Sequence, residues 1–81
     1  MFLTMAARGD KALGDVLRMH RKRRGESQEE VGYKAGLTAG TVSRIEQATA
    51  RPEWETVRAI ARALEVRLGD LGKEIEAVEG S

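Results

Sequence analysis

Residues 27–46 limit what this chain can fold into more than any other stretch. Ser27 stands three residues before Glu30, a spacing at which each side chain can cap the backbone of the other at the start of a helix. Gly36 supplies a backbone position with positive φ, which ends that helix in a tight corner, and Thr38 can cap a second helix directly after it. The apolar residues expected on the inner side are Val31, Leu37, Val42 and Ile45. The stretch therefore predicts two short helices joined by a sharp turn.

The outer face of the second predicted helix carries small or hydroxylated side chains and one guanidinium. Its residues are Ala39, Gly40, Thr41, Ser43 and Arg44. Side chains of this kind fit a DNA major groove, where an alanine methyl can contact a thymine methyl and an arginine can make a bidentate contact to guanine. We therefore expect these residues to read DNA bases, with Thr41, Ser43 and Arg44 carrying most of the readout and DNA shape contributing the rest. A purely structural pair of helices is the alternative.

Four further residues flank this face and are candidates for contacts with DNA phosphates. Gln28 opens the first helix of the pair, where backbone N–H groups add donors for an anion; an extra helix cap is the alternative role for its side chain. Thr38 is expected to act first as a cap and second as a phosphate contact. Thr49 and Arg51 follow the second helix and are expected to contact phosphate.

The distribution of charge supports an interaction with nucleic acid. The net charge is only +1, but residues 1–52 carry ten Lys and Arg against six Asp and Glu, whereas residues 53–81 carry four against seven. The two parts therefore hold charges of +4 and −3. A basic part that contains the predicted reading helix favours attraction to phosphate; chance clustering of solvated charges is the alternative.

Apolar spacing predicts three further helices. The first, over about residues 10–24, repeats apolar positions at helical spacing. Another follows Pro52, and we expect Trp54 to anchor it in the core. The apolar residues of the last helix, which starts near residue 67, are Leu68, Leu71, Ile75 and Val78. Leu68 and Leu71 are expected to close the core. Because the last two positions extend beyond what one small domain needs to cover, Leu71, Ile75 and Val78 are also the residues expected at a dimer interface.

From residue 13 to residue 71 the chain resembles the helix-turn-helix domains of the lambda-repressor and Cro family (XRE type). The matching landmarks are Leu13, Leu17 and Arg21, residues 27–31, Gly36-Leu37-Thr38, residues 42–46, Arg51-Pro52, Thr56-Val57, Ile60-Ala61 and Ala63-Leu64. The resemblance implies a compact, all-α, five-helix domain in which Arg21 and Glu46 form a structural charge pair. The chain departs from the family pattern at Glu26, Gly32 and Ala48; a non-Gly residue at the last position costs roughly 1 kcal/mol in a left-handed cap.

The expected organisation is a flexible N-terminal arm over residues 1–9, the DNA-binding domain over residues 10–72, and a C-terminal helical extension or tail over residues 73–81. The chain has no cysteine and one histidine, so we expect no disulfide, no metal site and no cofactor. No stretch approaches the roughly 20 apolar residues of a membrane span, and a reduced cytoplasm fits this composition. No cysteine nucleophile, phosphate-binding glycine loop or paired-carboxylate arrangement indicates an enzyme.

The function expected from the residues and the resemblance together is a transcription regulator. It would be a repressor or autoregulator that binds double-stranded DNA at a pseudo-palindromic operator as a homodimer. The alternative is an antitoxin or a bridging protein-interaction module, with a toxin or a polymerase as the protein partner. The acidic C-terminal part keeps that alternative open.

Overall fold

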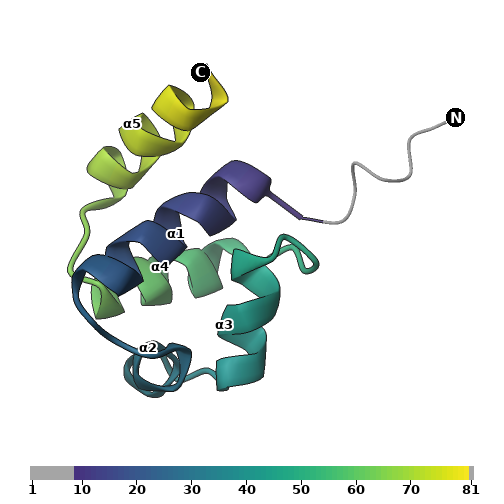
Figure 1. The fold of residues 1–81 in the computed structure, drawn as a ribbon, viewed down its shortest axis with the longest axis vertical. Helices are drawn as coiled ribbons and strands as arrows, with labels where there is room; N and C mark the ends of the chain where they lie inside the picture. The colour runs from purple at the N-terminus through teal and green to yellow at the C-terminus, as the bar shows by residue number, and fades with distance from the viewer. Residues whose placement is uncertain (1–8, 81) are drawn as a thin grey trace, which may run out of the picture.

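A computed structural model describes residues 9–80 as five helices and the turns between them (Figure 1). The helices are α1 (Lys11–Arg23), α2 (Gln28–Ala35), α3 (Ala39–Glu46), α4 (Trp54–Ala63) and α5 (Leu68–Glu79). No strand occurs between residues 9 and 80, and the predicted all-α, five-helix fold is confirmed. Of the N-terminal arm expected over residues 1–9, residues 1–8 lie outside the described residues.

Side-chain caps start the first three helices, as expected where polar residues precede an apolar period. Asp10 caps α1, its Oδ1 accepting from the backbone N–H of Leu13 at 3.0 Å. Ser27 and Thr38 cap α2 and α3 in the same way. The residues that precede α4 and α5, Glu53 and Arg67, make no side-chain cap hydrogen bond.

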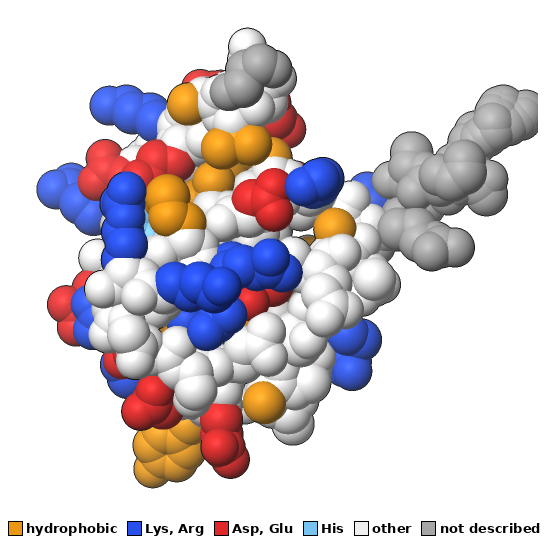
Figure 2. Space-filling model, viewed as in Figure 1, with side chains coloured by type: hydrophobic (Ala, Val, Ile, Leu, Met, Phe, Trp, Pro, Cys, Tyr) orange, Lys and Arg blue, Asp and Glu red, His pale blue; other side chains and the backbone are white. Residues whose placement is uncertain are grey.

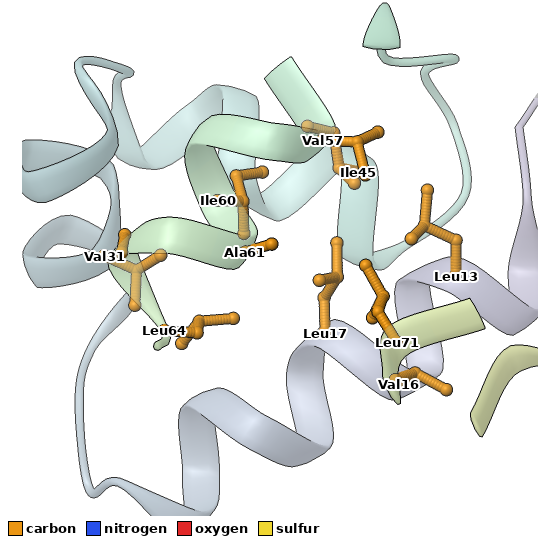
Figure 3. Close-up of a cluster of buried hydrophobic side chains, with 11 residues drawn as sticks. Leu13, Val16, Leu17, Val31, Ile45, Val57, Ile60, Ala61, Leu64 and Leu71 are labelled. Carbon is orange, nitrogen blue, oxygen red and sulfur yellow. The ribbon is translucent and has the colours of Figure 1, made fainter. Parts of the chain in front are cut away.

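One cluster of buried apolar side chains joins the helices (Figure 3). The labelled members are Leu13, Val16, Leu17, Val31, Ile45, Val57, Ile60, Ala61, Leu64 and Leu71. Every helix contributes at least one of these residues. Each fully buried leucine, isoleucine or valine stabilises the fold by about 1.5–3 kcal/mol relative to an exposed one. The cluster therefore fixes α3, the predicted reading helix, against α1 and α4.

Close backbone packing brings α1 against the end of α3. A Cβ atom built on Gly14 would lie 2.6 Å from the carbonyl oxygen of Glu46 and 2.7 Å from that of Ile45. Carbon and oxygen atoms do not approach so closely, so only glycine fits at residue 14 without moving α3. The same contact brings the polar side chains of α1 next to Glu46.

The last helix lies over α1 and is held by one buried leucine and one polar contact (Figure 1). Leu71 is 2% exposed, and Ile75 packs partly buried against the core. The polar contact joins His20 of α1 to Glu74 of α5, with the His20 Nε2 2.6 Å from Glu74 Oε1. The prediction that Leu68 closes the core is wrong: this first residue of α5 is exposed, because it lies one turn before the point where α5 meets α1.

The prediction that Trp54 anchors the core is also wrong. Its side chain is 62% exposed, although Val57, one turn further along α4, is buried. Trp54 is the first residue of α4 and borders a groove that also includes residues of α1 and α5. Its position on the apolar face of α4 was predicted correctly, but no described element covers that end of the face.

Candidate nucleic-acid interface

The corner between α2 and α3 is built by capping side chains and one left-handed glycine (Figure 1). Ser27 Oγ accepts from the Glu30 N–H at 3.0 Å, and Glu30 Oε1 accepts from the Ser27 N–H at 2.7 Å. Gly36 has φ = 77°, the conformation that suits glycine best. Thr38 Oγ1 then accepts from the Thr41 N–H at 3.1 Å and starts α3. The predicted helix-turn-helix geometry is confirmed in each of these details.

The candidate base-reading residues share the side of α3 that points away from the core. Val42, Ile45 and Glu46 are buried, whereas Gly40 and Arg44 are exposed. The remaining three candidates, Ala39, Thr41 and Ser43, are partly exposed. The structure therefore brings all five candidates to one accessible face of a short helix.

The side chain of Arg44 folds back over the first turn of α3. Its Nη2 donates to Thr41 Oγ1 at 3.4 Å, and a Cβ built on Gly40 would lie 3.4 Å from its Nη1. Thr41 Oγ1 in turn lies 3.0 Å from Thr38 Oγ1. The guanidinium lies beside Gly40, so the long cation and the hydroxyls form one polar surface over the start of the helix. The guanidinium has further N–H donors for a base or a phosphate.

Glu46, the last residue of α3, is the centre of a buried polar network. The residue is 4% exposed. Arg21 of α1 donates to it twice, from Nε to Oε2 at 2.7 Å and from a terminal nitrogen to Oε1 at 3.0 Å. Gln28 of α2 donates from Nε2 to the same Oε1 at 3.0 Å, and the Arg18 Nε lies 3.6 Å away. The pair expected between Arg21 and Glu46 is therefore present, and it ties together three helices.

This network keeps Glu46 charged. Burial by itself raises the pKa of the Glu46 carboxyl, but hydrogen bonds from Arg21 and Gln28 and the charges of Arg21 and Arg18 outweigh it, so the pKa lies below its ordinary value. The same hydrogen bond to Glu46 raises the pKa of Arg21. Both groups are ionised at neutral pH, and the paired charges fix the end of α3 against α1.

The structure places Gln28 and Arg18 in contacts that sequence reasoning missed. Gln28 was expected at a phosphate, yet one N–H of its amide is used on Glu46; its carbonyl oxygen makes no hydrogen bond within residues 9–80. Arg18 was not singled out at all. Helical spacing offered a signal for it, because residues three apart on a helix share a face and Arg18 precedes Arg21 by three.

The segment after α3 carries the last two phosphate candidates. Ala48 has φ = 60°, so this alanine takes the left-handed conformation at the position where the family pattern has glycine. Thr49 follows and donates its hydroxyl to the Arg44 carbonyl at 3.2 Å, which closes the helix end. Arg51 is exposed beyond this turn. Of the two candidates, Arg51 therefore has the freer side chain.

The three residues expected at a dimer interface differ in exposure. Leu71 is buried in the core of its own chain, as expected for a residue that closes the core, and it leaves little surface for a partner. Ile75 is partly buried, and Val78 is 41% exposed. The exposed apolar side chains of α5 are therefore Leu68 at its start and Val78 near its end, with Ile75 partly buried between them.

Figure 2 shows a group of Lys and Arg side chains in the middle of the molecular face that contains α1, with acidic side chains beside it and both kinds of charge nearer the edges. Among residues 9–80, no group of three or more His, Cys, Asp or Glu residues could hold a metal ion. No helix of the described chain has both the length and the apolar character needed to cross a membrane.

Comparison with protein families identifies the domain. No curated protein matches the chain. The model of a helix-turn-helix domain family matches residues 12–72, which contain all but the first residue of α1, the whole of α2 to α4 and the start of α5. This range agrees with the resemblance found from residue 13 to residue 71. It includes the corner at Gly36, the exposed face of α3 and the network around Glu46. The chain therefore belongs to this helix-turn-helix domain family, whose fold is that of a DNA-binding regulator.

Proposed function

We propose that this protein is a transcription regulator, acting as a repressor or autoregulator, that binds a pseudo-palindromic operator in double-stranded DNA as a homodimer. The observation that carries the proposal is the exposed face of α3, from Ala39 to Arg44, held in place at its far end by the buried carboxylate of Glu46. A short helix that shows small and hydroxylated residues and one arginine fits the major groove.

Arg44 is the main base-reading residue in this proposal. It is the one long cationic side chain on the exposed face of α3, and it lies over Gly40 and Thr41. A guanidinium in that position can donate two parallel hydrogen bonds to guanine O6 and N7. Thr41 and Ser43 add hydroxyls, and Ala39 adds a methyl group. Because these side chains are short, the sequence-dependent shape of DNA supplies the remaining specificity.

The phosphate contacts come from the edges of this face. The start of α2 offers backbone N–H groups and the amide of Gln28, whose carbonyl oxygen and second N–H are not used on Glu46. Arg51 offers an exposed cation on the other side, and Thr38 and Thr49 offer hydroxyl groups. Only the cationic contacts release counterions, so Arg51 contributes to the salt dependence of binding and Gln28 does not.

Dimerisation through α5 would place two copies of α3 about 34 Å apart, one turn of B-DNA, and would require an operator with two-fold symmetry. Val78 and Ile75 give this surface its apolar character.

Selection of bound sites from random duplex DNA, followed by electrophoretic shift at several salt concentrations, tests the proposal. We expect an enriched pseudo-palindrome and an affinity that falls steeply with salt. A binding constant that is the same at low and at physiological salt would contradict it, as would selection of no sequence. A chain that instead binds a protein and no DNA would be an antitoxin or a bridging module.

A further inference from the structure

An apolar groove of about 830 Å³ lies between the start of α1, the beginning of α4 and one side of α5 along its length. Trp54 and Val78 line it and are exposed, as is Leu68. Leu13 and Leu71 line its inner side. An exposed apolar surface of this kind on a small domain marks a site of interaction. No part of the described chain, residues 9–80, covers it.

The chain enters the described domain at the rim of this groove. Gly9 and Asp10 are among its lining residues. Gly9 is packed tightly: a Cβ atom built on it would lie 2.5 Å from the carbonyl oxygen of Ala48, in the turn that follows α3. The point at which residues 1–8 join the domain is therefore fixed next to the groove.

Residues 1–8 have the composition and the length to fill it. Six of the eight are apolar, namely Met1, Phe2, Leu3, Met5, Ala6 and Ala7, and none is acidic. An extended segment of eight residues spans about 26 Å at roughly 3.3 Å per residue. The α5 wall, with 12 residues, is about 18 Å long at 1.5 Å per residue. The segment can therefore run the full length of the groove from its fixed point at Gly9.

We propose that residues 1–8 of the same chain fold back into this groove and place Phe2 and Leu3 against Trp54 and the apolar side of α5. The gain is the burial of apolar surface on both sides. Because Ile75 and Val78 also line the groove, the segment and a second copy of the chain would compete for the same surface. Docking of residues 1–8 would then oppose dimerisation, and a rise in protein concentration would favour the dimer.

Trp54, the single tryptophan of the chain, reports on the groove directly. The full chain is compared with the double variant Phe2→Asn, Leu3→Asn and with the matched control Thr4→Asn, which places the same amide at a position that is already polar. Fluorescence emission and acrylamide quenching are measured at a concentration where sedimentation shows only monomers. Circular dichroism is used to check that all three chains have the same helix content.

We expect the double variant to shift Trp54 emission to longer wavelength and to raise the Stern–Volmer constant about twofold, since tryptophan has one of the largest apolar surfaces that a contact can cover. The control should behave as the wild type. Equal emission and quenching in all three monomeric chains would overturn the proposal. Shielding of Trp54 that is absent in the monomer and develops with concentration would also overturn it and would assign the groove to a second copy. Neither result depends on whether the protein binds DNA.

Discussion

Replacing Arg21 with Met tests whether the buried network around Glu46 holds the reading helix. Met keeps most of the packing volume and removes the guanidinium. The Glu46 side chain is 2% exposed and would keep only the amide of Gln28 at 3.0 Å and the Arg18 Nε at 3.6 Å. Breaking a buried pair from one side costs about 3–5 kcal/mol. Because Arg18 remains nearby, we expect a loss at the lower end, about 3 kcal/mol of unfolding free energy.

Urea unfolding measures this loss, and a double-mutant cycle assigns it. For a domain of this size, about 3 kcal/mol corresponds to a fall in Tm of roughly 12–24 °C. Glu46→Gln in the Arg21→Met background should restore part of the stability, because it removes the stranded charge. Lys11→Met is the control: it breaks an ion pair with Asp15 whose side chains are 83% and 42% exposed, and it should cost less than about 0.5 kcal/mol.

A cost for Arg21→Met as small as that of the control, together with additive effects in the cycle, would refute the reasoning. The orientation of α3 would then depend on the apolar core alone. If the cost is as large as expected, operator binding measured well below the lowered Tm should also weaken, because α3 loses its polar attachment to α1 while it remains folded.

The pH dependence of stability provides a second readout of the same pair. The pKa of Glu46 is below its ordinary value of 4.5 in the folded protein, so the folded state favours the carboxylate. This contribution is fully present above pH 4.5 and is lost as the pH falls through the lower folded-state pKa. The pKa of Glu26 is also lowered, mainly by a hydrogen bond from Lys34, so Glu26 also contributes stability that is lost in acid. Glu46→Gln should therefore reduce the loss of stability in acid, while the part due to Glu26 remains.

Three further predictions concern DNA binding. Arg44→Ala should cost about 1–3 kcal/mol of operator binding and relax the preference at one position in each half-site; a uniform loss across operator variants, measured by competition, would make Arg44 a phosphate contact. Gln28→Ala should weaken binding to all sequences alike and leave the salt slope unchanged, because a neutral amide releases no counterion; loss of preference at one base pair would contradict this role. Val78→Asp should yield a folded chain that sediments as a monomer and binds the operator weakly, whereas Ile75→Asp should also lower stability because Ile75 packs against the core; an unchanged dimer would show that the interface lies elsewhere.

The elements predicted correctly from sequence depend on contacts a few residues apart. The capping box of Ser27 and Glu30, the left-handed Gly36 and the cap at Thr38 each require a fixed residue type at a fixed spacing of three or four. Helical periodicity likewise identified the buried sides of α1 and α3. These features are visible in the sequence because the backbone geometry that they satisfy is local.

The features that were missed depend on how helices meet. The hydrogen bond from Gln28 to Glu46 joins residues 18 apart on different helices, and no spacing rule indicates it. Trp54 has the right periodicity for the core, but burial also requires a covering element, and α5 does not cover the first turn of α4. The burial predicted for Leu68 is wrong for the same reason, because no described element covers this side chain. Periodicity gives the direction in which a side chain points, and the lengths and angles of neighbouring helices decide whether something lies there.

The position of Gln28 connects the two kinds of DNA contact in the proposal. Its backbone starts α2, where phosphate would bind. Its side-chain amide donates a hydrogen bond to the carboxylate of Glu46, which fixes the far end of α3. Glu46 Oε1 receives this bond and one from Arg21. A shift of α2 on binding phosphate would therefore reach the reading helix through the hydrogen bond from Gln28, at an oxygen atom that Arg21 of α1 also holds. Because that oxygen is buried and charged, losing either bond is expensive, and the arrangement favours a rigid pair of helices that docks on DNA as one unit.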